Sequence, residues 1–435
     1  MSTIHDGVPR WFVALFPCVG ILFVLSYVGY LGFMWPETAT DPAFFQHTGW
    51  YVLNAGIPYV DVWDVNPPIV FGLTAVLAAF SGGNMVVLQT LSGALMTVVN
   101  ATSVLLVGWL AFRLTDDDVA AVAAGLVVLL VPEMYLMPPV GTRAQFYALF
   151  FGLVALRLVL QDRPVAAGAL AALSAGCWQP GAGFVLLVGG MAAQHDGWRG
   201  TLSVVIGTGV VAGPLVLGFA AVGALVPMGV ETILAPFVGG APYTLPGRIY
   251  SILLVFGYGM VVLPVAFYGW SRTGHDRRPY WVIAGALLFG LQALIVDMDG
   301  STDLVLWLAF VAFGVALAVA AVDPFPIRIP HIVTLQSRQW IVVVLVVLVL
   351  SGPVWHVTGS PLKSTLQDNE ERATPDEELP ITKDEASVPD MQTIYWEKRT
   401  PETCHYRLSR NELRWIAATD DRLHTIQCGQ WPTEF

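Results

Sequence analysis

The sequence predicts an all-α polytopic membrane protein, and three observations support this. Of its 435 residues, 55% are hydrophobic and only 12% are charged, whereas soluble domains carry about 25% charged residues. The mean hydropathy is +0.65. Apolar runs of about 20 residues recur from residue 11 to residue 358, and each is long enough to cross a hydrocarbon core of roughly 30 Å as a helix.

We predict about eleven transmembrane helices and one shorter apolar helix that does not cross. The first run has no small-residue cleavage site after it and is expected to be a retained helix. Residues 67–80 are the short case, because about 14 residues suit an interfacial or re-entrant segment. The predicted spans are 11–33, 84–111, 117–131, 143–160, 164–178, 180–194, 201–222, 248–270, 280–298, 302–322 and 340–358.

The distribution of arginine orients these spans in the cell membrane. If the N-terminus is cytoplasmic and residues 67–80 do not cross, most loop arginines fall on the cytoplasmic side. The opposite side then keeps only Arg143 and Arg248 before the C-terminal tail. If residues 67–80 crossed, all later loops would change sides and the bias would contradict the first helix. The segments expected outside are 41–83, 132–142, 223–247, 299–303 and the tail.

The chain divides by composition into three parts. Residues 1–358 form the predicted membrane domain, residues 359–390 an acidic linker, and residues 391–435 a small extracytoplasmic module. Cys404 and Cys428 in that module fit one disulfide if it is outside, or two free thiols if it is cytosolic. The net charge is −11, and because no basic patch with interleaved aromatics is present, nucleic acid is not an expected partner.

The first outer loop contains the most polar residues. Asp41-Pro42 is typical of a helix start, and Gly56 and Pro58 are expected to end that helix. Beyond it the chain is expected to be extended. The polar side chains of this loop are Asp41, His47, Asp61, Asp64 and Asn66. Asp41 is either a capping residue alone or a functional acid, and the others are either solvated loop residues or part of a site.

Two other outer segments carry isolated charged or polar groups. One contains Glu133, Arg143 and Gln145, and the other contains Glu231, Tyr243 and Arg248. An arginine at the membrane edge can simply extend to the water, but its guanidinium also suits a phosphate. The second segment is rich in Gly and Pro, so it is either a connector or a lid over a site.

The first outer loop resembles that of the GT-C integral-membrane glycosyltransferases, most closely the protein O-mannosyltransferase and aminoarabinose-transferase group. That group has an acidic motif, a Gly-x-x-Pro-Tyr-x-Asp-like turn and a Lys-Pro-Pro-Leu-like end. The matching residues here are Asp41-Pro42, Gly56, Pro58, Tyr59, Asp61 and Asn66-Pro67-Pro68-Ile69. The resemblance covers roughly residues 11 to 200, with a GT-C-like helical bundle as the implied fold. It departs at Pro42, Asn66 and Trp178-Gln179-Pro180, which stand where relatives have a second acid, a lysine and a lysine-containing turn.

The resemblance implies transfer of a sugar, with inversion, from a polyprenyl- or dolichyl-phosphate carrier to a glycan or protein acceptor on the outer face. A hexose such as mannose and a lipid-linked glycan are the expected substrates. Asp41 would be the general base, and Arg143, Arg248 and Tyr243 would bind the donor phosphate. His47, Asp61, Asp64 and Asn66 would bind acceptor hydroxyls or help to hold a divalent cation. Glu133 and Gln145 would be further substrate-binding residues. The alternatives are a lipid or sugar transporter or flippase, which favours ionisable groups within the spans, and a non-catalytic scaffold.

Overall fold

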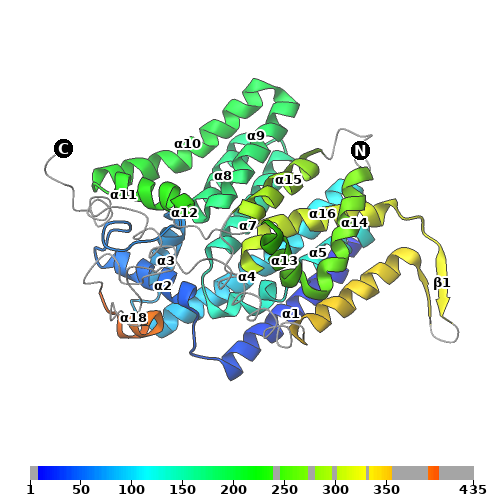
Figure 1. Ribbon diagram of the computed structural model, residues 1–435, viewed down its shortest axis with the longest axis horizontal. Coiled ribbons are helices and arrows are strands. Elements are labelled where there is room, and N and C mark those ends of the chain that lie inside the picture. Colours follow the sequence, from blue (N-terminus) through cyan, green and yellow to red (C-terminus); the bar gives the residue numbers. More distant parts are fainter. Residues whose placement is uncertain are drawn as a thin grey trace.

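A computed structural model describes residues 8–238, 245–272, 280–295, 301–329, 333–354 and 390–400. Tyr243, Cys404 and Cys428 lie outside these residues, as does almost all of the predicted acidic linker. The described chain is helical apart from one β-hairpin (Figure 1). In the hairpin, β1 (Pro326–Ile329) and β2 (Val333–Gln336) are antiparallel, with Pro326 opposite Gln336. The predicted all-α class is therefore confirmed.

The helices begin and end close to the bounds expected from hydropathy. The first half contains α1 (Arg10–Phe33), α2 (Thr40–Leu53), α3 (Ile69–Phe80), α4 (Met85–Thr115), α5 (Asp118–Val128), α6 (Glu133–Leu136), η1 (Pro138–Val140), α7 (Ala144–Val159), α8 (Pro164–Cys177), η2 (Gln179–Gly181), α9 (Ala182–Asp196) and α10 (Trp198–Ala221). The second half contains α11 (Leu225–Gly229), η3 (Val230–Leu234), α12 (Ala235–Val238), α13 (Leu245–Phe256), η4 (Gly257–Val261), α14 (Val262–Ser271), α15 (Tyr280–Ile295), η6 (Ser301–Leu304), α16 (Val305–Ala321), the helix Ser337–Val354 and α18 (Met391–Glu397).

The predicted number of eleven membrane spans is not confirmed. Within the described residues, five helices are long and apolar enough to cross a membrane, or seven if each of two bent pairs is one span. One bent pair joins α5 to residues 133–140 at 78°. All eleven predicted segments contain helix, but α7, α8 and α9 have only 16, 14 and 15 residues. At 1.5 Å per residue, helices of this length fall short of a hydrocarbon core of roughly 30 Å.

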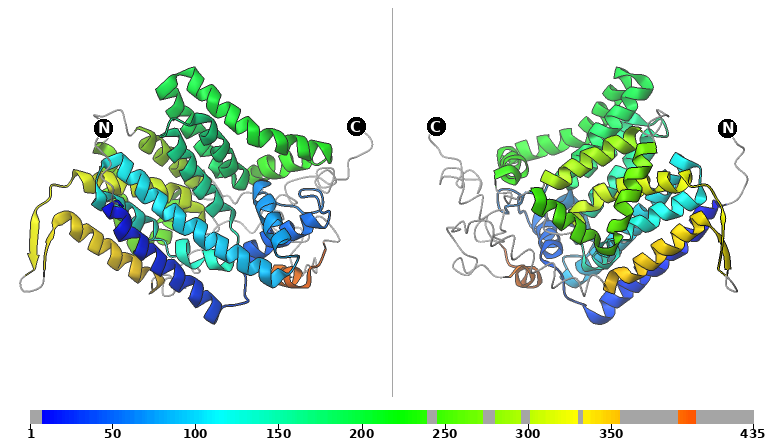
Figure 2. Two further views of the ribbon diagram at one scale, coloured as in Figure 1. Left: turned by 180° about the vertical axis from the view of Figure 1, so that it is seen from behind. Right: turned by 45° about the vertical axis from the view of Figure 1, so that its right-hand side comes forward.

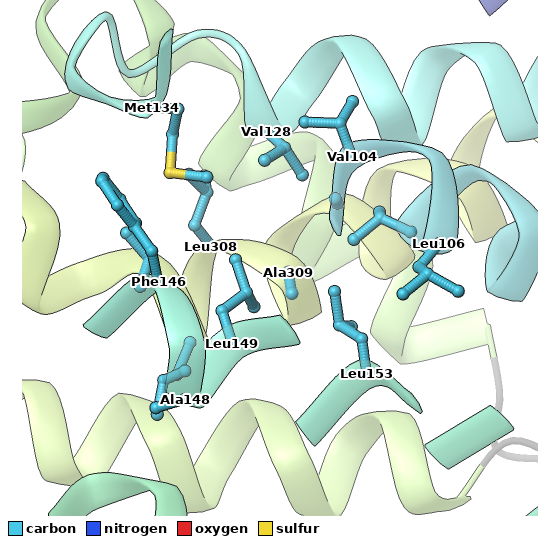
Figure 3. Packing of buried hydrophobic residues seen from close by; sticks show 14 of the residues in the cluster. Val104, Leu106, Val128, Met134, Phe146, Ala148, Leu149, Leu153, Leu308 and Ala309 are labelled. Carbon is cyan, nitrogen blue, oxygen red and sulfur yellow. The ribbon is translucent and has the colours of Figure 1, made fainter. Parts of the chain in front are cut away.

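The main core lies where α4, α5, α7 and α16 meet (Figure 3). Phe146, Leu149 and Leu153 form one buried face of α7, at the spacing of helical turns. Leu308 of α16 and Val104 of α4 pack toward the same region. Because α7 is fixed along this face, Arg143 at its N-terminal end has a defined position.

Small residues let other helices approach closely. A Cβ added to Gly168 of α8 would lie 2.1 Å from the carbonyl oxygen of Val204 in α10. A Cβ on Gly207 of α10 would lie 1.9 Å from the carbonyl oxygen of Val165. Backbone contact through small residues is the usual basis of helix association in lipid.

The short helices gather at one end of the bundle. Figure 1 places α2, α3, α11, α12 and α18 together at its left, while the β-hairpin projects at the right. The long helices α1 and α4 run side by side between the two ends (Figure 2). The helix Ser337–Val354 also lies along α1 in both views of Figure 2. The segments expected on the outer face thus include several that cluster at one end.

Arg338 ties the helix Ser337–Val354 to the bundle. Its Nη1 lies 2.6 Å from Oδ2 of Asp117, and its Nη2 donates to the carbonyl oxygen of Ala320 at 3.1 Å. Asp117 also caps α5. We expect Arg338→Met to lower the free energy of unfolding by about 2 kcal/mol, because it removes hydrogen bonds made by a charged group. Denaturant titration in detergent measures this; equal stability of Arg338→Met and Arg199→Met, a change at an exposed arginine, would contradict it.

Candidate functional site

Asp41 lies in the first turn of α2 and pairs with an arginine distant in sequence. The N-cap of α2 is Ala39, and no side chain caps the helix. Of the two interpretations of Asp41, the one that makes it a capping residue alone is therefore wrong. The Oδ2 of Asp41 lies 3.6 Å from Nη1 of Arg143, and the two side chains are 36% and 15% exposed. The structure thus brings together the predicted base and the predicted phosphate ligand.

Arg143 is placed by the helix that follows it. It occupies the N-cap position of α7 with an extended backbone and makes no side-chain cap. Its Nε is buried and has no hydrogen-bond partner within the described residues. A guanidinium has five N–H donors, and a contact of 3.6 Å is longer than a charge-assisted hydrogen bond. The group therefore retains donors for an anion.

The approach of these two residues depends on Gly141. This glycine has φ +132, and an added Cβ would lie 2.5 Å from Nε2 of Gln46 and 2.9 Å from Cβ of Pro42. The backbone conformation and the lack of space both favour glycine. The loop that carries Arg143 therefore contacts the turn of α2 that carries Asp41.

A buried set of hydrogen bonds fixes the same loop to the bundle. The carbonyl oxygen of Val140 accepts from Nε2 of Gln89 at 2.6 Å and from Oγ1 of Thr38 at 3.3 Å. Gln89 Nε2 also lies 2.8 Å from the hydroxyl oxygen of Tyr30, and that hydroxyl donates to the carbonyl oxygen of Glu37. These contacts join α1, α4 and the segment before α2. Sequence reasoning missed Gln89, which interrupts an apolar span as an uncharged polar residue.

Gln145 contacts an acid that sequence reasoning also missed. Its Nε2 donates to Oδ1 of Asp303 at 3.0 Å. Asp303 lines a hollow of about 10 Å³ together with Trp178, Gln292 and Trp307, which is room for roughly one water molecule. The available signal was the polar run "DMDGSTD" between two apolar segments. Asp303 is therefore an additional acidic candidate, in direct contact with the first turn of α7, the helix that begins after Arg143.

A second polar cluster joins the first outer loop to the 225–238 segment. The backbone N–H of Asp64 donates to Oε2 of Glu231 at 2.9 Å. Asp64 Oδ1 accepts from Nδ2 of Asn66 at 2.6 Å. Gln179 Nε2 donates to the carbonyl oxygen of Val65 and, at 3.3 Å, to that of Thr232. Asp64 and Glu231 are buried, so the hydrogen bond that joins the two segments is shielded from water.

The remaining predicted residues have different surroundings. Oδ2 of Asp61 accepts from the backbone N–H of Ile57 at 2.7 Å and so closes its own turn. Glu133 is buried at the start of α6, and Arg248 in α13 is 1% exposed. Burial raises the pKa of Tyr59 well above its usual range, and the carboxylates of Asp64 and Glu231 add to that shift. Among the described residues, no group of three or more His, Cys, Asp or Glu side chains is arranged to hold a metal ion.

His47 is buried in α2 and is uncharged at neutral pH. Burial lowers its pKa to about 4, an effect that a hydrogen bond to the backbone of Arg399 partly opposes. An unfolded chain has a histidine pKa near 6.5, so the unfolded state binds the additional proton between these two values. The contribution of His47 to the free energy of unfolding is therefore fully present above pH 6.5. It falls by about 3 kcal/mol as the pH decreases toward 4.

We expect His47→Gln to have a flatter dependence of unfolding free energy on pH between 6.5 and 4 than the unmodified protein. Denaturant titrations at several pH values measure this difference. His195→Gln is the control, because His195 is exposed. Parallel pH curves for His47→Gln and the unmodified chain would contradict the assignment.

Comparisons with known proteins bear on the fold and on the enzyme class. A family model described as DolP-mannose mannosyltransferase matches residues 55–218. The chain is 28% identical over 422 residues to the dolichol phosphate-mannose mannosyltransferase of Haloferax volcanii, a match covering 91% of this chain and 92% of that protein. The crystal structure of ArnT from Cupriavidus metallidurans bound to undecaprenyl phosphate superposes with a TM-score of 0.57 and 14% identity, covering 91% of this chain and 86% of that one.

These similarities confirm the predicted resemblance. The superposition on ArnT confirms the GT-C-like fold over most of the chain. The sequence relative extends through the later helices as well, whereas the resemblance inferred from the sequence covered roughly residues 11 to 200. The family model spans Arg143 and begins after Asp41.

Proposed function

We propose that this chain is a membrane mannosyltransferase that takes mannose from a dolichyl- or polyprenyl-phosphate carrier and transfers it to a glycan hydroxyl. The broader prediction, a multi-pass membrane glycosyltransferase with a lipid-phosphate sugar donor, is confirmed by the relatives and the shared fold. Mannose itself is supported by the names of the family model and of the Haloferax volcanii relative. The acceptor class rests on the sequence resemblance alone.

The observation that carries the proposal is the pair formed by Asp41 and Arg143, 3.6 Å apart. In the proposed reaction an acceptor oxygen attacks C1 of the sugar, and the bond from C1 to the phosphate oxygen breaks. The phosphate leaves with the electron pair, and Arg143 stabilises its charge. The acceptor proton passes to Asp41. Attack opposite the leaving phosphate gives inversion at C1.

Most of the rate gain is expected from positioning and from phosphate stabilisation. A carboxylate is a weak base near neutral pH, so proton transfer contributes less than the placement of the acceptor beside C1. Arg143 can meet both partners, because its Nη1 lies 3.6 Å from Oδ2 of Asp41 and its Nε has no partner among the described groups. The start of α7 adds the partial positive charge of a helix N-terminus.

Roles for the other residues follow from where they lie. Arg248 and Tyr243 are proposed as additional phosphate ligands. The second cluster, with Asp64 and Asn66, is proposed to bind acceptor hydroxyls, as is Gln145. His47 and Asp61 are proposed to bind the acceptor too. Their contacts within the chain also give them a structural role. Glu133 is retained as a candidate for acceptor binding.

Orientation in the membrane is also proposed. The N-terminus is placed in the cytoplasm, and Asp41, Arg143 and the C-terminal tail on the outer face, on the basis of the arginine distribution. To test this, single cysteines are added before residue 8 and after residue 400, in a background lacking the four native cysteines, and intact cells are treated with a membrane-impermeant maleimide. Labelling of only the C-terminal cysteine in intact cells is the expected result.

A panel of lipid-phosphate sugars tests the proposed function. Purified protein in liposomes is given mannosyl-, glucosyl- and aminoarabinosyl-phosphate lipids with a lipid-linked glycan acceptor, and transfer is measured by mass spectrometry. We expect the mannosyl donor to give the highest kcat/KM. Preference for another sugar would overturn the mannose assignment, and no transfer from any donor while the lipid moves between leaflets would overturn the enzyme assignment.

A further inference from the structure

The C-terminal segment returns to the site through a short helix. α18 (Met391–Glu397) lies almost 350 positions after α2 in the sequence, yet the two helices pack together (Figures 1 and 2). Asp390 caps α18 by accepting from the backbone N–H of Gln392 at 3.2 Å. Met391, Ile394 and Tyr395 are buried in the contact. This spacing is that of one helical face, so α18 is seated on the bundle by its apolar side.

Tyr395 links this helix to the first turn of α2. Its side chain is 0% exposed, and its hydroxyl donates to the carbonyl oxygen of Met85 at 2.7 Å. The same hydroxyl lies 3.4 Å from Oε1 of Gln46. Gln46 Nε2 in turn donates to the carbonyl oxygen of Pro42 at 2.9 Å, which directly follows Asp41. The contacts therefore run from the C-terminal segment to the residue next to the proposed base.

A second contact lies one residue further along α2. His47 forms a hydrogen bond with the backbone of Arg399, and the backbone N–H of Arg399 donates to the carbonyl oxygen of Ile394 at 3.1 Å. His47 is fully buried. The turn after α18 is thus closed over α2, and two successive α2 residues, Gln46 and His47, have partners from the C-terminal segment.

These contacts matter because the start of α2 has no side-chain cap. The first turn of a helix has N–H groups without helical partners and frays easily. Gln46 and Gly141 both contact the segment at Pro42. The Tyr395 hydroxyl contacts Gln46 from the other side, with Oε1 of Gln46 as the longer of its two acceptors. Hydrogen bonds between buried polar groups hold those groups firmly in position. Breaking such a bond leaves a buried donor or acceptor without a partner, because water cannot reach it.

We propose that Tyr395 is a positioning residue for the transfer reaction, acting through Gln46 to keep the first turn of α2 and its Asp41 carboxylate in place beside Arg143. This inference rests on the proposed function, in which Asp41 accepts the acceptor proton. It gives the C-terminal segment a part in catalysis that its sequence did not reveal. Tyr395 itself makes no contact with the reacting atoms in this scheme.

Tyr395→Phe tests the proposal, because it removes only the hydroxyl. We expect kcat to fall roughly 3- to 10-fold, as for the loss of one hydrogen bond, with KM for the mannosyl-phosphate lipid little changed because Arg143 is untouched. Amide hydrogen exchange over residues 40–46 should become faster. Lys398→Gln, at an exposed side chain directly after the same helix, is the control and should leave both quantities unchanged. Gln46→Met, which interrupts the link from the other side, should reproduce the loss of kcat.

The outcomes separate this proposal from the proposed function. Equal kcat and equal exchange for Tyr395→Phe and Lys398→Gln would overturn the positioning role, and so would faster exchange without loss of kcat. If Tyr395→Phe does not fold, Gln46→Met decides in the same way. If the unmodified protein transfers no sugar, the proposed function fails, while the exchange comparison still shows whether α18 holds the first turn of α2; unchanged exchange then overturns the link itself.

Discussion

Asp41→Asn is expected to lower kcat for sugar transfer by about 10²- to 10⁴-fold, the usual contribution of a general base. The amide keeps the size of the side chain but has no negative charge and accepts a proton poorly. Asp41 is not a helix cap, so the substitution should leave the fold intact. Steady-state kinetics with a labelled donor measures kcat, and a thermal unfolding curve in detergent verifies the fold.

Asp162→Asn is the matched control for that experiment. Asp162 is exposed and has φ +58, a backbone conformation that asparagine adopts readily. The same chemical change therefore occurs at a site without a proposed role. Turnover of Asp41→Asn equal to that of Asp162→Asn would show that Asp41 is not the base.

Hydropathy predicted the helices well because each depends on local sequence. The first helix, expected at 11–33, is found at Arg10–Phe33, and the segment expected at 84–111 is α4 (Met85–Thr115). The helix after Asp41 ends before Gly56, as the glycine and Pro58 indicated. The number of spans was harder to predict, because apolar composition does not reveal where a helix bends. The 109° bend between Leu254 and Gly259 divides the span expected at 248–270 into two pieces.

The site was only partly predictable, because its contacts join residues far apart in sequence. The outer-loop argument selected Asp41 and Arg143 as members of one face, yet only the structure gives the contact between them. Asp303 lies in a polar connection that offered no reason to pair it with Gln145. Gln89 and Gln46 are uncharged residues within helices, so composition did not distinguish them from packing residues. Periodicity identifies buried faces, whereas the partners across them depend on tertiary structure.

Arg143→Ala is expected to lower kcat/KM for the donor by about 10²- to 10³-fold, similar to the loss of one preorganised donor to a developing anion. Part of the loss should appear as a higher KM for the lipid-phosphate sugar, since the ground-state phosphate is charged as well. Arg143→Lys should recover only part of the activity. Lysine keeps the charge but lacks the planar fork that contacts a carboxylate and a phosphate together. Kinetics at varied donor concentration separate the two effects.

Lys398→Gln provides the comparison for charge alone, because Lys398 is an exposed cation in the tail, on the same proposed outer face as Arg143. If loss of net positive charge weakened donor binding through the membrane surface, both substitutions would raise KM equally. High salt would then bring KM of both variants to the value of the unmodified protein. The geometry of the pair argues for a local effect instead. Arg143 is mostly shielded from solvent and its carboxylate partner lies at 3.6 Å, so its contribution should change little with ionic strength. A full recovery of kcat/KM in Arg143→Lys would contradict a bridging guanidinium, because a point charge would then be sufficient for catalysis.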